Sequence, residues 1–243
     1  MAITADQFAP ANSTVGNNGA ALTVTFGANP AAQATILVGM WVETQLGLVD
    51  TLTDNGGNTY TQDILWRAGI ITATVFVWRS TNIPLKMPGS GTLQVTMTFG
   101  GNNPNAFRGF AARSYLGMQG RVDNSGGNAT NATGVFTISE TIAPNTSSCL
   151  FFSVYGNTTG ASGANPSVAS PFSKVTSWDT GISAEVGAIG EFIATDKNAQ
   201  TATWTTLATE YPYTYLVTYP PSVPIVAPEI VVPSWAVTRS YHY

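Results

Sequence analysis

Charged side chains are scarce in this chain. Asp, Glu, Lys and Arg make up 9% of its 243 residues, against about a quarter in an ordinary soluble protein. Thr, Asn, Ser, Gly and Ala take their place. The nine Lys and Arg form no cluster, and the net charge is −4. We therefore expect neither nucleic acid, whose phosphates require basic clusters, nor a membrane surface as a partner.

Cysteine and histidine are almost absent. Cys149 is the one cysteine, and His242, the penultimate residue, is the one histidine. A single cysteine cannot form an internal disulfide, and we interpret Cys149 as a buried strand residue. A histidine at a chain end is poorly placed to act as a base or a metal ligand. The sequence thus offers no Ser-His-Asp or Cys-His arrangement and no zinc site, and we predict no cofactor.

The sequence also lacks nucleotide-binding motifs and long apolar runs. It contains no P-loop and no G-x-G-x-x-G after a strand. No run approaches the roughly 20 apolar residues that cross a bilayer. The N-terminus, M-A-I-T-A-D-Q-F-A-P, has neither the basic nor the apolar region of a secretory signal. We therefore expect the protein to be made in the host cytoplasm without a signal peptide.

Paired carboxylates are the one enzymatic chemistry left to consider. Glu185 and Glu191 lie in S-A-E-V-G-A-I-G-E-F, on the same face of a continuous strand. At about 3.3 Å per residue their Cα atoms would lie about 20 Å apart, too far for a glycoside hydrolase pair. Another strand would have to supply the second carboxylate, for example Glu43 or Asp179, and no pattern indicates this. We predict that the protein is not an enzyme.

Strand patterns dominate what is present. In residues 92–99, T-L-Q-V-T-M-T-F, every second residue is apolar, which is typical of a strand with one solvated face. Residues 34–42 and 71–78 are apolar on both faces and are predicted as central strands. Further strands are predicted at residues 22–26, 59–66, 107–116, 135–141, 149–155, 184–194, 201–207 and 213–219.

Turn residues separate these segments. They occur at residues 27–30 (G-A-N-P), 88–91 (P-G-S-G), 100–104 (G-G-N-N-P) and 124–128 (N-S-G-G-N). Ten or so short strands with turns at this spacing indicate a β-sandwich or jelly roll. The predicted fold is all-β, an antiparallel, jelly-roll-like sandwich in one domain, residues 1–219. Residues 220–243 form a separate extended arm.

The C-terminal arm, residues 220–243, is rich in proline and in apolar residues. Five prolines fall between Pro220 and Pro233, and proline excludes the segment from the interior of a sheet. Its apolar side chains include Ile225, Ile230, Val232 and Trp235. Such an arm requires a groove or a sheet edge, either on its own domain or on a neighbouring subunit, and the sequence leaves both alternatives open.

A polar, glycine-rich stretch, T-L-T-D-N-G-G-N-T-Y-T, spans residues 51–61. Calcium loops converge several carboxylates, and this stretch supplies only Asp54. Asn55, Gly56, Gly57 and Asn58 are instead residues that accept positive φ in tight turns. We interpret the stretch as a hairpin turn that Asp54 holds by accepting backbone N–H groups.

Tyrosines alternate near the end of the predicted domain. Tyr211, Tyr213, Tyr215 and Tyr219 fall on one face of a strand. If that face were exposed, it would form a stripe that could bind a glycan or a protein. The alternative, which we favour, is that the tyrosines cover one side of the sandwich core with their hydroxyls at its rim.

The stretch at residues 51–61 and the segment before it, A-T-I-L-V-G-M-W-V, are similar to a pattern found in a known group of proteins. With A-A-R-S-Y-L-G-M at residues 111–118 and R-V-D at residues 121–123, they resemble jelly-roll-like β-sandwich modules of tailed-phage virion proteins and bacterial surface proteins. The likeness covers most of residues 20–219, leaves the arm outside, and implies no catalytic residues.

The leading functional hypothesis is a structural virion protein, either a capsid decoration or cement protein or a tail or fibre component. It would form a homo-oligomer, contact other virion proteins, and reside in the virion. The rival hypothesis is a carbohydrate-binding adhesion module, whose partner would be a glycan. A polysaccharide-degrading enzyme is third.

Overall fold

The computed structural model describes residues 2–15, 21–42, 48–69, 73–100, 107–130, 134, 137–159, 165–179, 185–206 and 210–222. Sixteen strands run through these residues. They are β1 (Thr4–Val15), β2 (Ala21–Thr25), β3 (Thr35–Val42), β4 (Leu48–Asp54), β5 (Tyr60–Ala68), β6 (Ala73–Ser80), β7 (Gln94–Gly100), β8 (Phe107–Leu116), β9 (Asn124–Ala129), β10 (Thr137–Ile142), β11 (Leu150–Thr159), β12 (Ser167–Val168), β13 (Ser173–Asp179), β14 (Val186–Ile193), β15 (Gln200–Thr205) and β16 (Glu210–Tyr219).

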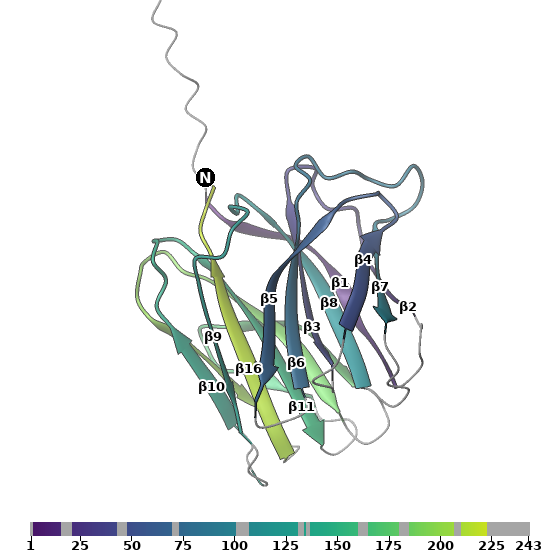
Figure 1. The fold of residues 1–243 in the computed structure, drawn as a ribbon. Helices are drawn as coiled ribbons and strands as arrows, with labels where there is room; N and C mark the ends of the chain where they lie inside the picture. Colours follow the sequence, from purple (N-terminus) through teal and green to yellow (C-terminus); the bar gives the residue numbers. More distant parts are fainter. Residues whose placement is uncertain are drawn as a thin grey trace, which may run out of the picture.

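These strands form four antiparallel sheets in the described part of the chain. The first inner sheet has the order β1-β8-β3-β6-β5, and the first outer sheet has the order β2-β7-β4. The second inner sheet has the order β9-β16-β11-β14-β13, and the second outer sheet has the order β10-β15-β12. Figure 1 shows the layers in sequence, with β10 at one side, β2, β4 and β7 at the other, and the inner sheets between them.

The two halves of the chain repeat one topology. Strands β1 to β8 take the same places in the first pair of sheets as strands β9 to β16 take in the second pair, so that β1 corresponds to β9 and β8 to β16. Each half is therefore an eight-stranded, jelly-roll-like sandwich. The predicted all-β antiparallel sandwich is confirmed, and the structure adds that the chain holds two of them. The domain boundary at residue 219 stays a prediction.

The halves pack through their inner sheets. β3 lies against β11, β1 against β13, and β5 against β9. A central strand therefore faces its own counterpart, and each edge strand faces the opposite edge of the other half. This is the arrangement of an isologous dimer, in which one surface meets a second copy of itself.

A core rich in aromatic residues fills the space between the inner sheets. Trp41, Tyr115, Phe152 and Tyr213 are buried there. The ring of Trp41 meets Tyr213 edge to face at 5.9 Å, a favoured geometry for aromatic pairs. Gly187 lies beneath Trp41, and a Cβ atom added to it would collide with that indole. Glycine at this position lets a large ring reach the opposing sheet.

Each outer sheet covers a second hydrophobic core and turns hydroxyl groups to solvent. In the first outer sheet, Val95 and Met97 point inward, while Thr96 pairs its hydroxyl with that of Thr23 at 2.9 Å. The second outer sheet repeats the pattern, with hydroxyl pairs at Ser139–Thr203 (2.9 Å) and Thr141–Thr201 (2.7 Å). Alternation of apolar and hydroxyl residues along each strand produces both faces.

The predicted turn at residues 124–128 is wrong, because these residues belong to strand β9 and pair with β16. Their glycines are required by packing rather than by a bend. A Cβ on Gly127 would come within 2.5 Å of the Tyr215 ring and 2.7 Å of Trp66. A Cβ on Gly126 would come within 2.6 Å of the Glu140 carboxylate. Glycine therefore lets a strand lie between two crowded layers.

The first three residues of the predicted arm dock on the chain's own fold. Met118 and Pro221 form an antiparallel bridge. Gln119 N donates to the Pro220 carbonyl at 2.8 Å, and Ser222 N donates to the Gly117 carbonyl at 2.7 Å. The chain is thus fixed to the first half as it leaves β16. Across the described ranges, no helix is both long and apolar enough to cross a bilayer.

Candidate functional site

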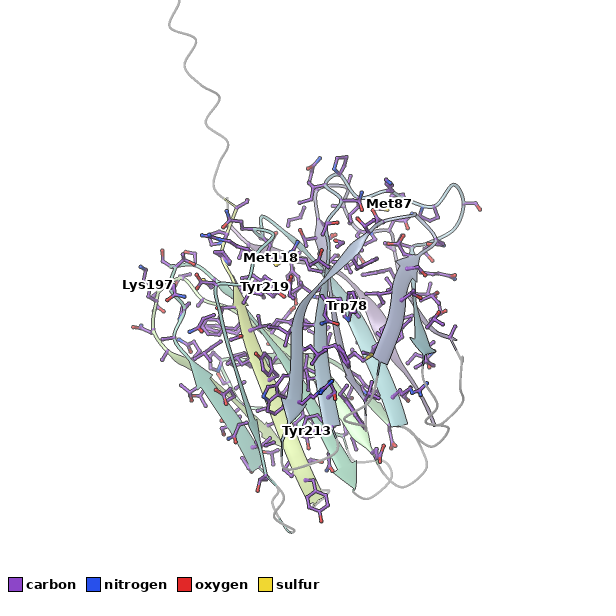
Figure 2. All side chains as sticks on the ribbon, in the orientation of Figure 1. Trp78, Met87, Met118, Lys197, Tyr213 and Tyr219 are labelled. Carbon is purple, nitrogen blue, oxygen red and sulfur yellow. The ribbon has the colours of Figure 1, made fainter. Side chains whose placement is uncertain are left out.

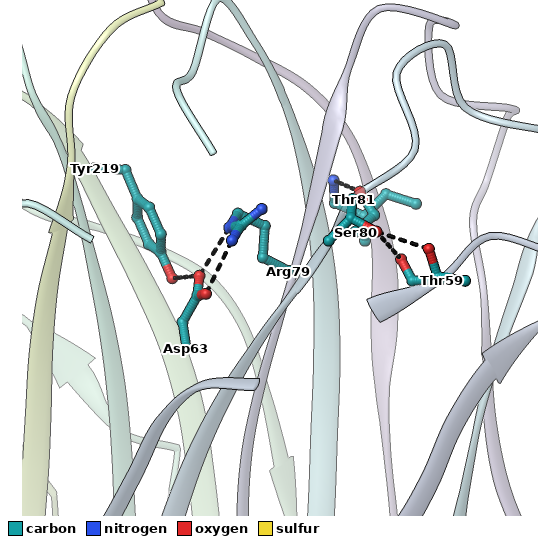
Figure 3. Close-up of polar contacts among 7 residues, drawn as sticks. Thr59, Asp63, Arg79, Ser80, Thr81 and Tyr219 are labelled. Carbon is teal, nitrogen blue, oxygen red and sulfur yellow. Dashed lines mark hydrogen bonds and ion pairs between the residues drawn. The ribbon is translucent and has the colours of Figure 1, made fainter. Parts of the chain in front are cut away.

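The first charged cluster between the inner sheets joins Asp63, Arg79 and Tyr219. Arg79 donates to the Asp63 carboxylate through Nε at 2.9 Å and through one terminal nitrogen at 3.1 Å. Tyr219 donates its hydroxyl to the same carboxylate at 2.9 Å. Figure 3 shows the aspartate held between the guanidinium and the phenol. Asp63 and Arg79 lie in the first half and Tyr219 in the second, so the cluster spans the interface.

The second cluster repeats this chemistry with Glu191 as its acid. Arg113 donates to both Glu191 oxygens, at 3.0 and 3.2 Å. Tyr115 donates to Glu191 Oε2 at 2.5 Å. The Arg113 guanidinium also lies over the Phe8 ring, 5.8 Å from its centroid. Here the arginine and tyrosine come from β8 in the first half, and the glutamate comes from β14 in the second.

The tyrosine of each cluster is held in its protonated form. Burial, reinforced by the Glu191 carboxylate, raises the pKa of Tyr115 well above its usual value. Burial and the Asp63 carboxylate do the same to the pKa of Tyr219. Each tyrosine therefore remains a proton donor at neutral pH, and each carboxylate is held by a bidentate arginine. These contacts tie strands of the two halves together.

Of the carboxylates considered from sequence for a hydrolase, Glu43 lies outside the described residues. Glu191 is held by Arg113 and Tyr115, while Glu185 is buried immediately before β14. Within the described ranges, no group of three or more His, Cys, Asp and Glu side chains is placed to hold a metal ion.

Asp54 organises the bend between β4 and β5. Its Oδ1 accepts the backbone N–H groups of Gly56 and Asn58, both at 3.0 Å. Its Oδ2 accepts from the Asn58 side chain at 2.9 Å and from the Tyr60 hydroxyl at 2.7 Å. Burial, followed by the charge of Asp54, raises the pKa of Tyr60. All four contacts are internal, so the carboxylate serves as a structural acceptor.

The prediction of a bend is confirmed, but the prediction of a hairpin is wrong. β4 pairs with β7 in the first outer sheet, and β5 pairs with β6 in the first inner sheet. The bend therefore carries the chain from one layer to the next. Asn58 fixes this crossing, because its side chain bonds both the N–H and the carbonyl of Lys86, at 2.7 and 2.8 Å. Gly57 has φ = 79°, and Asn55 bonds the backbone of Gln94.

The predicted tyrosine stripe lies in β16. The side chains of Tyr213, Tyr215 and Tyr219 are buried against the first half, and Tyr211 is partly buried at the edge of the same core. Figure 2 shows Tyr213 and Tyr219 toward opposite ends of the molecule. The rings cover the core, as in the alternative favoured from sequence, but the hydroxyls of Tyr213 and Tyr219 are buried and do not lie at its rim. The three buried rings offer no exposed face to a glycan.

The remaining predicted residues divide into two groups. Cys149 is buried, as expected, and its thiol lies 3.0 Å from the Thr146 carbonyl. Burial raises the pKa of this thiol. The arm residues Ile225, Ile230, Val232 and Trp235, together with His242, lie outside the described residues.

Comparison with protein families, with curated proteins and with solved structures found no match to this chain. What the protein does is therefore argued from its own geometry.

Proposed function

We propose that the chain is a non-enzymatic structural subunit of a phage-like virion, either a capsid decoration or cement protein or a tail or fibre component. In this role it joins copies of itself and neighbouring virion proteins through backbone pairing and shape. The resemblance of residues 20–219 to virion modules first suggested this role, and the geometry of the interface between the halves supports it.

The observation that carries the proposal is the use made of the charged groups. The two carboxylates between the inner sheets, Asp63 and Glu191, are each bound by an arginine and a tyrosine, and each accepts at least one hydrogen bond from the other half. The charged contacts at Asp63 and Glu191 thus join one sandwich to the other. Fully satisfied, charge-assisted contacts of this kind rigidify a core, which suits a protein that supplies shape.

The direct test is to locate the protein. Particles purified from the producing cells by density and size should contain this chain in a fixed ratio to the major capsid or tail protein, measured by quantitative mass spectrometry. A chain that stays in the soluble fraction, at no constant ratio to any particle protein, would overturn the proposal.

The carbohydrate-binding rival loses the feature on which it was based. It requires an exposed aromatic stripe, and Tyr213, Tyr215 and Tyr219 are buried. We therefore carry only the structural proposal forward.

A further inference from the structure

We propose that Glu140 makes the seam between β9 and β10 sensitive to protons, so that this side of the second sandwich closes tightly in acid and loosens toward neutral pH. The inference goes beyond the proposed function and does not depend on it. It follows from a difference between two halves that are otherwise built alike.

The seam is the contact between β9, an edge strand of the second inner sheet, and β10, an edge strand of the second outer sheet. Figure 1 shows the two strands side by side at one side of the molecule. Asparagine side chains join them. Asn128 Nδ2 donates to the Ser139 carbonyl at 2.8 Å, and Asn124 Nδ2 donates to the Ala143 carbonyl at 2.7 Å. These two bonds bracket Glu140, which is the only titratable residue of the two strands.

The first half contains the same seam between β1 and β2, and this identifies the residue that corresponds to Glu140. Asn12 Nδ2 donates to the Thr23 carbonyl at 2.9 Å, in the manner of Asn128. The residue after the accepting carbonyl is Val24 in the first half and Glu140 in the second. Both residues pair with the central strand of their own outer sheet. A carboxyl group thus stands where the other half has a valine.

The space beside these two side chains differs to match. Val24 is 2% exposed and is buried in the same core as Ala9 of β1. Glu140 is partly buried, and the residue of β9 beside it is Gly126. A Cβ atom added to Gly126 would come within 2.6 Å of Glu140 Oε1. The carboxyl group therefore points from β10 toward β9, into space that a glycine leaves open.

Among the residues that the structure describes, no cation is paired with this carboxyl group. β15, which also packs against β10, has no titratable side chain, and the tyrosines of β16 belong to the core between the inner sheets. Glu210 of β16 lies about 20 Å along that strand from the partner of Gly126. In the adjoining loops, Asp123 and Cys149 are hydrogen-bonded to the backbone of residues 145–146. Glu140 therefore ionises without a compensating charge.

The direction of the pH response follows from this environment. Burial raises the pKa of Glu140 above its ordinary value of 4.5, and a hydrogen bond from the Thr141 backbone offsets part of the rise. The stability that the neutral carboxyl group supplies is therefore complete below pH 4.5, its value in the unfolded chain, and is lost as the pH rises through the folded-state value. Opening of the seam gives the ionised group the solvent that burial denies it.

Opening of the seam uncovers apolar side chains. Ile138 and Ile142 share a face of β10 with Glu140, and both are buried in the outer cores of the second half. Leu216 of β16 is buried in the same cluster as Ile142. The two asparagine bonds are neutral, so ionisation of Glu140 weakens a seam that is otherwise indifferent to pH. Acid thus covers a hydrophobic surface that neutral pH makes accessible.

Hydrogen–deuterium exchange of the full-length chain, measured by mass spectrometry over residues 124–142, tests the seam. Wild type and Glu140→Gln are compared at the same pH, so that the chemical rate of amide exchange cancels. Glutamine keeps the shape of the side chain and cannot ionise. Asp196→Asn is the matched control, because Asp196 is an exposed acid of the same half that bonds within its own turn.

At pH 7 we expect the amides of β9 and β10 to exchange at least about threefold faster in the wild type than in Glu140→Gln. At pH 4 the two proteins should exchange alike, and Asp196→Asn should match the wild type at both pH values. Equal exchange of wild type and Glu140→Gln at pH 7 would overturn the proposal. So would a difference of the same size at both pH values, which would indicate a packing effect of the substitution.

Glu140→Val, which installs the residue of the first half, gives a second measurement. Chemical denaturation should show that its advantage in stability over the wild type grows from pH 4 to pH 7, because only the wild type ionises at this position. An advantage that stays constant over this range, or that shrinks, would contradict the assignment of the pH response to Glu140.

Discussion

The Tyr219 hydroxyl donates to Asp63 Oδ2 at 2.9 Å across 156 positions of sequence, from the last strand of the second half to the fifth strand of the first. The same carboxylate receives Arg79 from its own half (Figure 3). Asp63 thus contacts both sandwiches, and loss of its pairing should lower the stability of the whole fold.

Replacing Arg79 with alanine tests this cluster. The substitution leaves Asp63, whose side chain is 6% exposed, with a buried and uncompensated charge. Breaking such a pair typically costs about 3 kcal/mol or more. Chemical denaturation should show this loss in the free energy of unfolding. The control is Arg121→Ala, at an exposed arginine whose side chain donates to Gln119, with an expected change of about 0.5 kcal/mol or less. Equal effects of the two substitutions would contradict the assignment.

Gly187→Ala tests the fit of the inner sheets. The added methyl group would collide with the indoles of Trp41 and Trp178, and overpacking of a core typically costs about 1–3 kcal/mol. The melting temperature should fall, and the near-ultraviolet circular dichroism of the tryptophans should change. Gly89→Ala is the matched control, because a Cβ there meets no atom within 4 Å. A tolerated Gly187→Ala would mean that the sheets are less closely packed than described.

Asp54→Ala tests the crossing between layers. It removes the acceptor for two backbone N–H groups, the Asn58 amide and the Tyr60 hydroxyl. Each unsatisfied partner costs about 1 kcal/mol, so we expect a loss of about 3 kcal/mol in the free energy of unfolding. Asp196→Ala is the control, since Asp196 holds a similar but exposed turn with Asn198. If Asp54→Ala costs no more than this control, the carboxylate does not organise the bend.

Alkaline pH should destabilise the protein through its buried tyrosines. Burial, with a neighbouring carboxylate, raises the pKa of Tyr60, Tyr115 and Tyr219 above the ordinary value of 10.0. A raised pKa in the folded state gives stability that is complete below the unfolded pKa and is lost as the pH rises above it. The free energy of unfolding should therefore be flat up to about pH 10 and then fall, by up to about 1.4 kcal/mol per pH unit for each tyrosine.

Denaturation series at several pH values measure this slope, and absorbance of the phenolate follows ionisation in the native protein. The double variant Tyr115→Phe, Tyr219→Phe should show a shallower decline above pH 10. Native protein in which all the tyrosines ionise at their ordinary pKa would refute the burial of these hydroxyls.

The alternation of apolar and polar residues predicted many of the strands. It predicted neither which strands pair nor that the sandwich occurs twice. β3 and β7 carry the patterns of a central strand and a half-solvated strand, and both were predicted as strands. β1 was missed because it contains Pro10 and two register shifts, which disrupt its periodicity. β9 was misread because its glycines serve packing. The repeated topology was not predicted, since strand order depends on contacts between residues far apart in the chain.

Only part of the candidate site could be predicted from the sequence. The Asp54 bend could be predicted, because Asx-turn chemistry is local. The clusters at Asp63 and Glu191 were missed, because their partners lie in distant strands. A signal for them did exist. Arg79 and Arg113 each share a face with apolar residues, Val77 and Ala111, that enter the central core, and an arginine in such a row requires a buried acid.

The face-to-face arrangement of the two sandwiches has a consequence for dilute conditions. A dimer of separate subunits dissociates as its concentration falls, because association competes with translational freedom. In this protein a peptide link holds the paired bodies near each other at all times, so their effective concentration is set by the chain and not by the surroundings. The central layer should persist in a single isolated molecule.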